Sequence, residues 1–179
     1  MGRSRVWAWI AGIVILAGTI WYSGTGDVTA QQESTPGTQA TPPAAIGRDV
    51  LTTGMPPGAP GQALQLARYT IPAGAVLAVH VHPGMQTAWI ESGELTYHVI
   101  KGEAPIGRGA TAATPGPTES LGTGETTILG PGDWVVEAPG VVHYGENLTS
   151  EPVIILAATL FEVGEPSAIP VDAEGTPVA

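Results

Sequence analysis

Three of the four histidines have spacings that suit a metal site. His80 and His82 are two residues apart in an apolar segment, and side chains two apart on a β-strand point to the same face. Their imidazoles would lie about 6 to 7 Å apart along such a strand, close enough to converge on one ion. His143 comes far along the chain after Pro139-Gly140, and Gln86 follows the turn after His82. Gln86 therefore can face the same pocket as the two histidines that precede it.

The segments around these histidines resemble the two motifs of the cupin superfamily. The first motif, G(x5)HxH(x3,4)E(x6)G, is matched by Gly74, His80, His82 and Gly93, with Gln86 where a glutamate is expected. The second, G(x5)PxG(x2)H(x3)N, is matched by Gly132, Gly140, His143 and Asn147, with Ala138 at the proline position. The resemblance implies a double-stranded β-helix, a small jelly-roll barrel with a metal inside. By position, the implied ligands are His80, His82, Gln86 and His143.

Gln86 is the departure from the motif that changes the expected chemistry. An amide is a neutral and weaker oxygen donor than a carboxylate, so three imidazoles would hold a divalent ion without a compensating anion. We therefore expect a lower metal affinity and a stronger Lewis acid than in a site with glutamate. The donors do not distinguish Fe, Mn, Zn, Ni or Cu. Two alternatives stay open: Gln86 hydrogen-bonds beside the ion, or the histidines only pack inside a metal-free barrel.

Other residues are candidates for the pocket. Tyr97 and His98 are neighbours on one predicted strand, so one of them faces the barrel, where it could hydrogen-bond or transfer a proton. Tyr144 is a further pocket candidate beside His143. Glu91 and Glu137 are acid or base candidates, but the strand parity of Glu91 is opposite to that of Gln86, and we expect solvent exposure for both glutamates.

The elements that position these groups are short strands. Apolar, β-branched runs are separated every 8 to 12 residues by Gly or Pro, which is typical of an all-β sandwich or barrel. Strands are predicted over residues 64–71, 75–81, 86–90, 94–101, 125–129, 134–138, 142–147 and 153–163. Residues 102–124 have few large side chains and are expected to form a long excursion between two groups of strands.

The ends of the chain have a different character from this barrel. Arg3 and Arg5 precede an uncharged apolar run over residues 6–22, which predicts a helical signal peptide or membrane anchor over residues 1–30. Cleavage before Gln31 and an uncleaved anchor both fit. Residues 31–45 lack large apolar side chains and are predicted to be a disordered linker. The barrel is expected over residues 46–163, followed by a flexible tail over residues 164–179 that Ile169 and Val171 could still attach to the barrel.

Composition excludes several classes of protein. The net charge of -10 leaves no basic surface for nucleic acid, and the absence of cysteine excludes disulfides and thiolate metal sites. The predicted leader implies an exported protein, either secreted or anchored at the outer face of the cytoplasmic membrane, with no other membrane contact. The resemblance implies a mononuclear metalloenzyme for a small molecule, dioxygenase-like or a metal-assisted isomerase or hydrolase. The alternative is a non-catalytic module for a small ligand or metal, and a homodimer is consistent with either.

Overall fold

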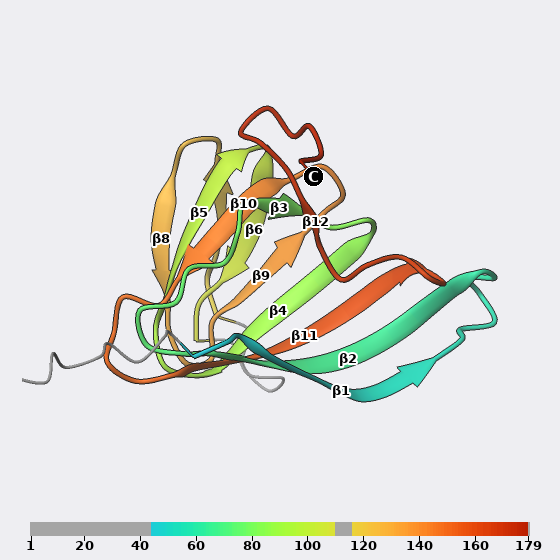
Figure 1. Cartoon of the computed structure of the whole chain (residues 1–179), viewed down its shortest axis with the longest axis horizontal. Coiled ribbons are helices and arrows are strands. Elements are labelled where there is room, and N and C mark those ends of the chain that lie inside the picture. The colour runs from blue at the N-terminus through green and yellow to red at the C-terminus, as the bar shows by residue number, and fades with distance from the viewer. Residues whose placement is uncertain (1–43, 110–115, 179) are drawn as a thin grey trace, which may run out of the picture. The chain divides into compact units, whose positions relative to one another are not determined.

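The computed structural model describes residues 44–109 and 116–178, which form two antiparallel β-sheets with a shared core (Figure 1). The all-β prediction is confirmed for these residues. The predicted signal or anchor helix and most of the predicted linker lie outside them. No helix in the described ranges has the length and apolar character needed to cross a bilayer.

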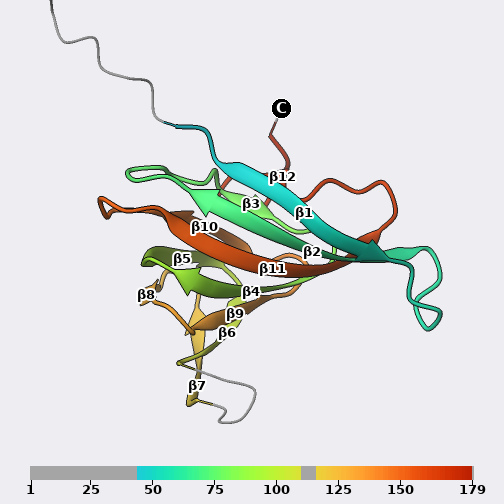
Figure 2. The ribbon, with the colours of Figure 1, turned by 90° about the horizontal axis from the view of Figure 1, so that it is seen from below.

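The sheets differ in size, and Figure 2 shows the larger one from its β1 edge to its β7 edge. In sheet order, its seven strands are β1 (Gly47–Gly54), β2 (Gln62–Ile71), β11 (Val153–Glu162), β4 (Met85–Ser92), β9 (Trp134–Glu137), β6 (Glu103–Gly107) and β7 (Thr118–Gly122). The five strands of the smaller sheet are β12 (Ile169–Pro170), β3 (His80–Val81), β10 (Val142–Glu146), β5 (Leu95–Lys101) and β8 (Thr126–Leu129).

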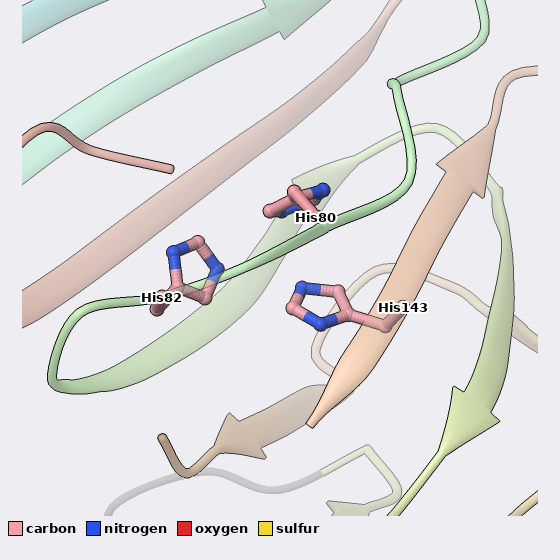
Figure 3. Close-up of side chains that lie close together, drawn as sticks. All are labelled: His80, His82 and His143. Atoms are coloured by element: carbon pink, nitrogen blue, oxygen red, sulfur yellow. The ribbon is translucent and has the colours of Figure 1, made fainter. Parts of the chain in front are cut away.

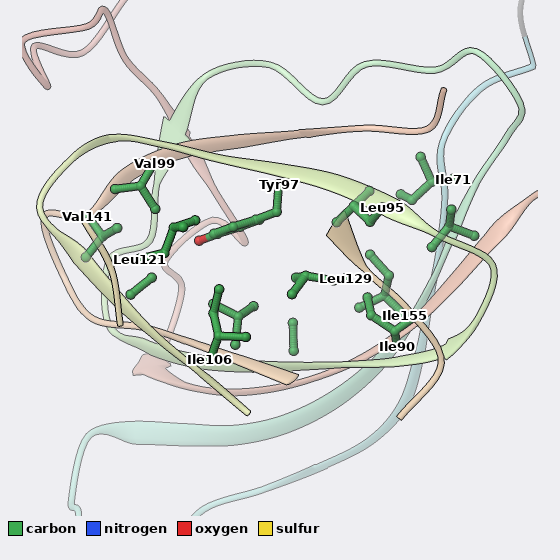
Figure 4. Close-up of a cluster of buried hydrophobic side chains, with 14 of the residues drawn as sticks. Ile71, Ile90, Leu95, Tyr97, Val99, Ile106, Leu121, Leu129, Val141 and Ile155 are labelled. Atoms are coloured by element: carbon green, nitrogen blue, oxygen red, sulfur yellow. The ribbon is translucent and has the colours of Figure 1, made fainter. Parts of the chain in front are cut away.

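Alternation along the strands places the core between the sheets. In β5, the apolar or aromatic side chains of Leu95, Tyr97 and Val99 are buried, whereas the residues between them are partly exposed. Figure 4 shows these three side chains on one side of the core, with Ile106 and Ile155 of the other sheet facing them. Removing a side chain of this size from water stabilises a fold by about 1.5 to 3 kcal/mol. The alternating pattern therefore fixes which β5 residues face the interior.

Seven of the predicted strands are confirmed by β2, β4, β5 and β8 to β11. The prediction over 75–81 is too long, because only His80 and Val81 form a strand there. The expected excursion over 102–124 is wrong in part, since it contains the antiparallel pair β6 and β7. Strand β1 was not predicted either. It lies at the sheet edge with almost every residue exposed, so it lacks the buried apolar face that a period of two reveals.

The segment after Gly164, for which composition predicts a flexible tail, packs against the barrel. In β12, Ile169 pairs with Val81 and Pro170 pairs with His80. Val171 is only 4% exposed, and its N–H donates to the Val79 carbonyl at 3.1 Å. This segment therefore forms the second neighbour of the short strand that carries His80.

Candidate metal centre

The three motif histidines meet between the sheets. His80 in β3 is the register partner of His143 in β10, and His82 follows β3 directly. Their ring centroids are 4.3 Å apart for His80 and His143, 4.9 Å for His80 and His82, and 5.1 Å for His82 and His143. One ring nitrogen of each lies within 4.8 Å of those of the other two. Figure 3 shows the three rings gathered between the β3 segment and β10.

Each imidazole is oriented by a backbone carbonyl. The Nδ1 atoms are at hydrogen-bond distance from the oxygens of Ala78 for His80 (2.7 Å), Ser167 for His82 (2.8 Å) and Val141 for His143 (3.0 Å). A carbonyl oxygen only accepts, so the proton of each neutral ring must be on Nδ1. The lone pair is then on Nε2. Metal-binding histidines in metalloproteins commonly donate their other ring N–H to a backbone carbonyl in this way.

A carboxylate that was expected in solvent contacts two of the three histidines. Glu137 is 3% exposed, and among the residues that the structure describes it is the one acidic side chain that is buried. Its Oε1 is 3.1 Å from His143 Nε2 and its Oε2 is 3.2 Å from His82 Nε2. The expectation of exposure for Glu137 is therefore wrong, and so is the expectation of three imidazoles without a nearby anion.

The charges in the cluster shift the pKa values in opposite directions. Burial alone would raise the pKa of Glu137, but the charge of His143 and the hydrogen bonds from both histidines hold it well below its usual range. Burial also acts to lower the pKa of His143, but the Glu137 carboxylate outweighs it and raises that pKa. Burial, with His143 nearby, lowers the pKa of His80 to about 4. His80 is therefore a neutral ring at neutral pH.

Gln86 contacts the cluster through its amide nitrogen. Its Nε2 donates to Glu137 Oε2 at 2.6 Å and lies 2.9 Å from His82 Nε2. Its Oε1 is buried without a hydrogen-bond partner within the described ranges. An amide nitrogen in this position donates protons and offers no lone pair to a metal. The Gln86 amide thus donates to Glu137 through its nitrogen, and its unpartnered oxygen is the atom that has a lone pair for a metal.

A cavity of about 190 Å³ adjoins the cluster. Its wall is mainly apolar and includes Ile71, Leu77, Ile90, Leu129, Val135 and Ile155. The histidines, Gln86 and Glu137 form its polar part. An engineered apolar cavity of 150 Å³ holds benzene, so this space suits a molecule of about one ring or a short chain.

The three pocket candidates have different positions. Tyr97 lines the cavity, with its ring centroid 5.6 Å from that of His143, and its buried hydroxyl has no hydrogen-bond partner in the described part of the chain. Burial, followed by the Glu137 charge, raises the pKa of Tyr97. His98 and Tyr144 do not line the cavity and stack on each other at 4.2 Å. His98 Nε2 is 2.9 Å from Glu146 instead.

Two further sequence features have structural roles. Glu91 is exposed, as expected, and pairs with Arg68 at 3.1 Å. Asn147 is fully buried, and its amide donates to the carbonyls of Ile71 at 2.9 Å and Glu151 at 2.7 Å. Although Asn147 begins a glycosylation sequon, its side chain is thus committed to holding the loop between β10 and β11.

Glu137 is an acid or base candidate in the sequence, but its place beside the histidines is not evident there because β9 is apolar on both faces. Trp134 and Val136 alternate with Val135 and Glu137, so the pattern does not say which face is inside. The signal that was available is a single glutamate in an otherwise apolar strand. Its meaning depends on the pairing of β9 with β4, in which Glu137 lies opposite Gln86. That register cannot be obtained from a local pattern.

The residues present fit a divalent transition metal. Each ring in its neutral form presents an Nε2 lone pair, and His143 Nε2 faces a Glu137 carboxylate oxygen at 3.1 Å. Because Nδ1 of His143 already donates to Val141, this contact needs either a proton on Nε2 or a cation between the two atoms. The three ring nitrogens lie within 4.8 Å of one another, which is close to the separation of nitrogens that share one ion at about 2.1 Å.

Comparisons with known proteins give similarity in fold. No protein family profile matches the chain, and no curated protein matches it. Among solved structures, a cupin superfamily protein of Desulfitobacterium hafniense is 11% identical, with a TM-score of 0.45, over 68% of this chain and 83% of that chain. The cupin_2 domain of an XRE family transcriptional regulator from Enterobacter cloacae is 17% identical, with a TM-score of 0.45, over 66% and 97%.

A cupin 2 domain-containing protein of Halorhodospira halophila is 14% identical, with a TM-score of 0.47, over 73% of this chain and 72% of that chain. At these sequence identities and TM-scores, the similarity does not indicate a function for this chain. The topology of this chain stands on its own: two antiparallel sheets enclose one core, and both histidine motifs meet between them. The chain is an all-β sandwich, and the cupin proteins named above are similar to it in fold alone.

Proposed function

We propose that this chain is an exported cupin that binds one divalent transition metal at His80, His82 and His143 and acts on a small molecule in the adjoining cavity. The observation that carries the proposal is the convergence of three buried or half-buried imidazoles whose Nδ1 atoms are all bonded to backbone carbonyls. Export is inferred from residues 1–30 alone.

The apolar wall of the cavity and the polar groups at one side of it support a small and largely apolar ligand. The apolar wall favours a hydrocarbon or aromatic body, and the cluster at one side favours a polar end. A bound divalent ion would supply Lewis acidity toward an oxygen of the ligand and, if redox-active, reactivity with dioxygen. The protein's own contribution is to hold the ligand against the cluster and to exclude water from it.

The test begins with the metal. Protein purified without chelators should contain about one transition metal ion per chain by elemental analysis, and Co²⁺ should bind with the same stoichiometry in calorimetry. His80→Ala and His143→Ala should each lower the Co²⁺ affinity by about 100-fold or more, because each removes a ligand. His98→Ala is the matched control, since His98 lies outside the cluster. A folded wild-type protein that binds no Co²⁺ would overturn the proposal.

The enzymatic and the non-catalytic interpretations share this metal site and differ in turnover. The cavity disfavours only a site that stores metal, because such a site does not need an apolar chamber beside it, whereas an enzyme and a small-ligand module both need one. Small phenols and short carboxylic acids can be screened with the metal-loaded protein for binding and for consumption of dioxygen. Metal-dependent turnover of a ligand supports the enzyme. A ligand that binds and is not turned over supports the non-catalytic binding module.

A further inference from the structure

Gln86 and Glu137 occupy equivalent positions on two neighbouring strands. They are register partners in the antiparallel pair of β4 and β9, and both are buried, with 7% and 3% of their surfaces exposed. Directly opposite residues on such strands have Cβ atoms about 4.5 to 5.5 Å apart. A carboxylate on β9 can therefore reach nearly the same point between the sheets as a carboxylate on β4.

The Glu137 carboxylate contacts two of the three histidines. Its Oε1 is 3.1 Å from His143 Nε2, and its Oε2 is 3.2 Å from His82 Nε2. A carboxylate buried this deeply is costly unless cations or hydrogen-bond donors surround it. A divalent ion at the cluster would supply that positive charge and would have in Glu137 its only buried counter-charge among the described residues.

The amide of Gln86 explains why this position is not a glutamate. Its nitrogen donates to Glu137 Oε2 at 2.6 Å, so a glutamate here would bring two carboxylates to hydrogen-bond distance. Two such groups cannot both ionise without strong repulsion. The pair is therefore complementary: one member carries the charge and the other donates a hydrogen bond to it.

We propose that Glu137 is the anionic metal ligand of this barrel and that Gln86 is a positioning residue that orients it. The carboxylate which the cupin motif places at position 86 has moved across one strand to position 137. This inference rests on the proposed function, because it requires an ion at the three histidines. It also changes the expected chemistry, since the ion has a compensating negative charge after all.

The test compares Co²⁺ binding by the full-length wild-type chain and three variants. Glu137→Gln removes the charge and keeps the shape. The double variant Gln86→Glu, Glu137→Gln exchanges the two groups across the strand pair and keeps the composition. Glu146→Gln is the matched control, because it removes a carboxylate that pairs with His98 at 2.9 Å outside the cluster. Affinity is measured by calorimetry, ligand type by the visible absorption of Co²⁺, and folding by circular dichroism.

Glu137→Gln should lower the Co²⁺ affinity by about 10- to 100-fold or more and alter the Co²⁺ absorption bands, because a ligand is lost. The exchange variant should recover most of that affinity. Glu146→Gln should stay within about twofold of the wild type, since it acts at a separate site. A merely structural Glu137 would change folding stability without moving the Co²⁺ spectrum, and the exchange would rescue nothing.

The outcomes separate the two proposals. A wild-type protein that binds no Co²⁺ overturns the proposed function. Binding that is lost in His143→Ala but unchanged in affinity and spectrum in Glu137→Gln overturns this inference and leaves the proposed function standing. If Glu137→Gln does not fold, the exchange variant decides: recovered binding supports the inference, and a folded exchange variant without binding overturns it.

Discussion

His80 and His143 lie directly opposite each other in the antiparallel pair of β3 and β10, with ring centroids 4.3 Å apart. Strand β3 is only two residues long, and the antiparallel pairing with the β10 segment continues before it through the bridge of Val76 with Glu146 and the hydrogen bond from the Leu77 N–H to the Gly145 carbonyl at 2.9 Å. On its other side β3 is paired with β12, where Pro170 lies opposite His80. The geometry of the histidine cluster therefore depends on a short strand that is held from both edges.

We expect the C-terminal segment to support metal binding. A chain that ends at Val163 loses the Ser167 carbonyl that accepts from His82 Nδ1 and loses β12. Its Co²⁺ affinity should fall by about 10- to 100-fold, the usual cost of removing the partner that orients a metal-binding histidine. A chain that ends at Asp172 keeps both features and is the control. Equal affinity of the two shortened chains in calorimetry would contradict this role.

The turn between β3 and β4 should tolerate no side chain at Gly84. A Cβ there would collide with the Leu160 carbonyl oxygen and lie 2.7 Å from Cδ1 of Phe161, whose ring stacks on His82. Gly84→Ala should lower the free energy of unfolding by about 1 to 3 kcal/mol, as overpacking does, and also weaken Co²⁺ binding through His82. Urea denaturation measures the first effect and calorimetry the second.

Gly58→Ala is the control for this substitution. Gly58 is exposed in the loop between β1 and β2, and an added Cβ would meet no atom within 4 Å. Its replacement should leave stability unchanged or raise it slightly by restricting the unfolded chain. A loss of stability in Gly58→Ala as large as that in Gly84→Ala would contradict the steric explanation.

The histidine positions were predictable because the information is local. Side chains two apart on a strand share a face, and this periodicity groups His80 with His82, whereas the grouping with His143 is what the resemblance to the two cupin motifs implies. Glu137 was not predictable in the same way. Its role depends on which strand lies beside β4 and in what register, and pairing between strands distant in sequence leaves no signature in either strand alone.

The same limit explains the strands that were missed. Pro105 and Gly107 weaken the local strand pattern of β6, yet Ile106 is fully buried because β7 and β9 pair with it on both sides. Tertiary pairing here outweighs the intrinsic preference of the residues. Tyr97 and His98 lie between these two cases. Alternation along a strand predicts that one of them faces inward, but it does not say which one.

Stability should depend on pH through Asp133, outside the metal centre. Burial alone would raise its pKa, but the N–H groups of Gly130 and Gly109, together with Arg108, lower it overall. A carboxyl with a lowered folded-state pKa stabilises the fold above its unfolded pKa of about 4, and this contribution is lost as pH falls through the folded-state pKa. Acid should therefore weaken the fold at this turn.

Urea denaturation at pH 6 and at steps from pH 4 downward measures this dependence. Asp133→Asn should be less stable than the wild type at pH 6, and the difference should shrink as the pH falls. The exposed Asp49 provides the control. Asp49→Asn removes the same charge but leaves the contacts of Asp133 in the β8–β9 turn intact. A difference between Asp133→Asn and the wild type that stays constant with pH would contradict the role of the carboxylate.

The Tyr97 hydroxyl should be dispensable for folding while its ring is not. The ring is 2% exposed in the core, whereas the hydroxyl has no hydrogen-bond partner among the described residues. Tyr97→Phe removes an unpaired buried polar group, so the free energy of unfolding should stay the same or rise by about 1 kcal/mol. Tyr97→Ala should lower it by about 3 to 5 kcal/mol, the cost of emptying an aromatic position. A loss above about 1 kcal/mol in Tyr97→Phe, measured in urea, would instead show that the hydroxyl donates to Glu137 in solution.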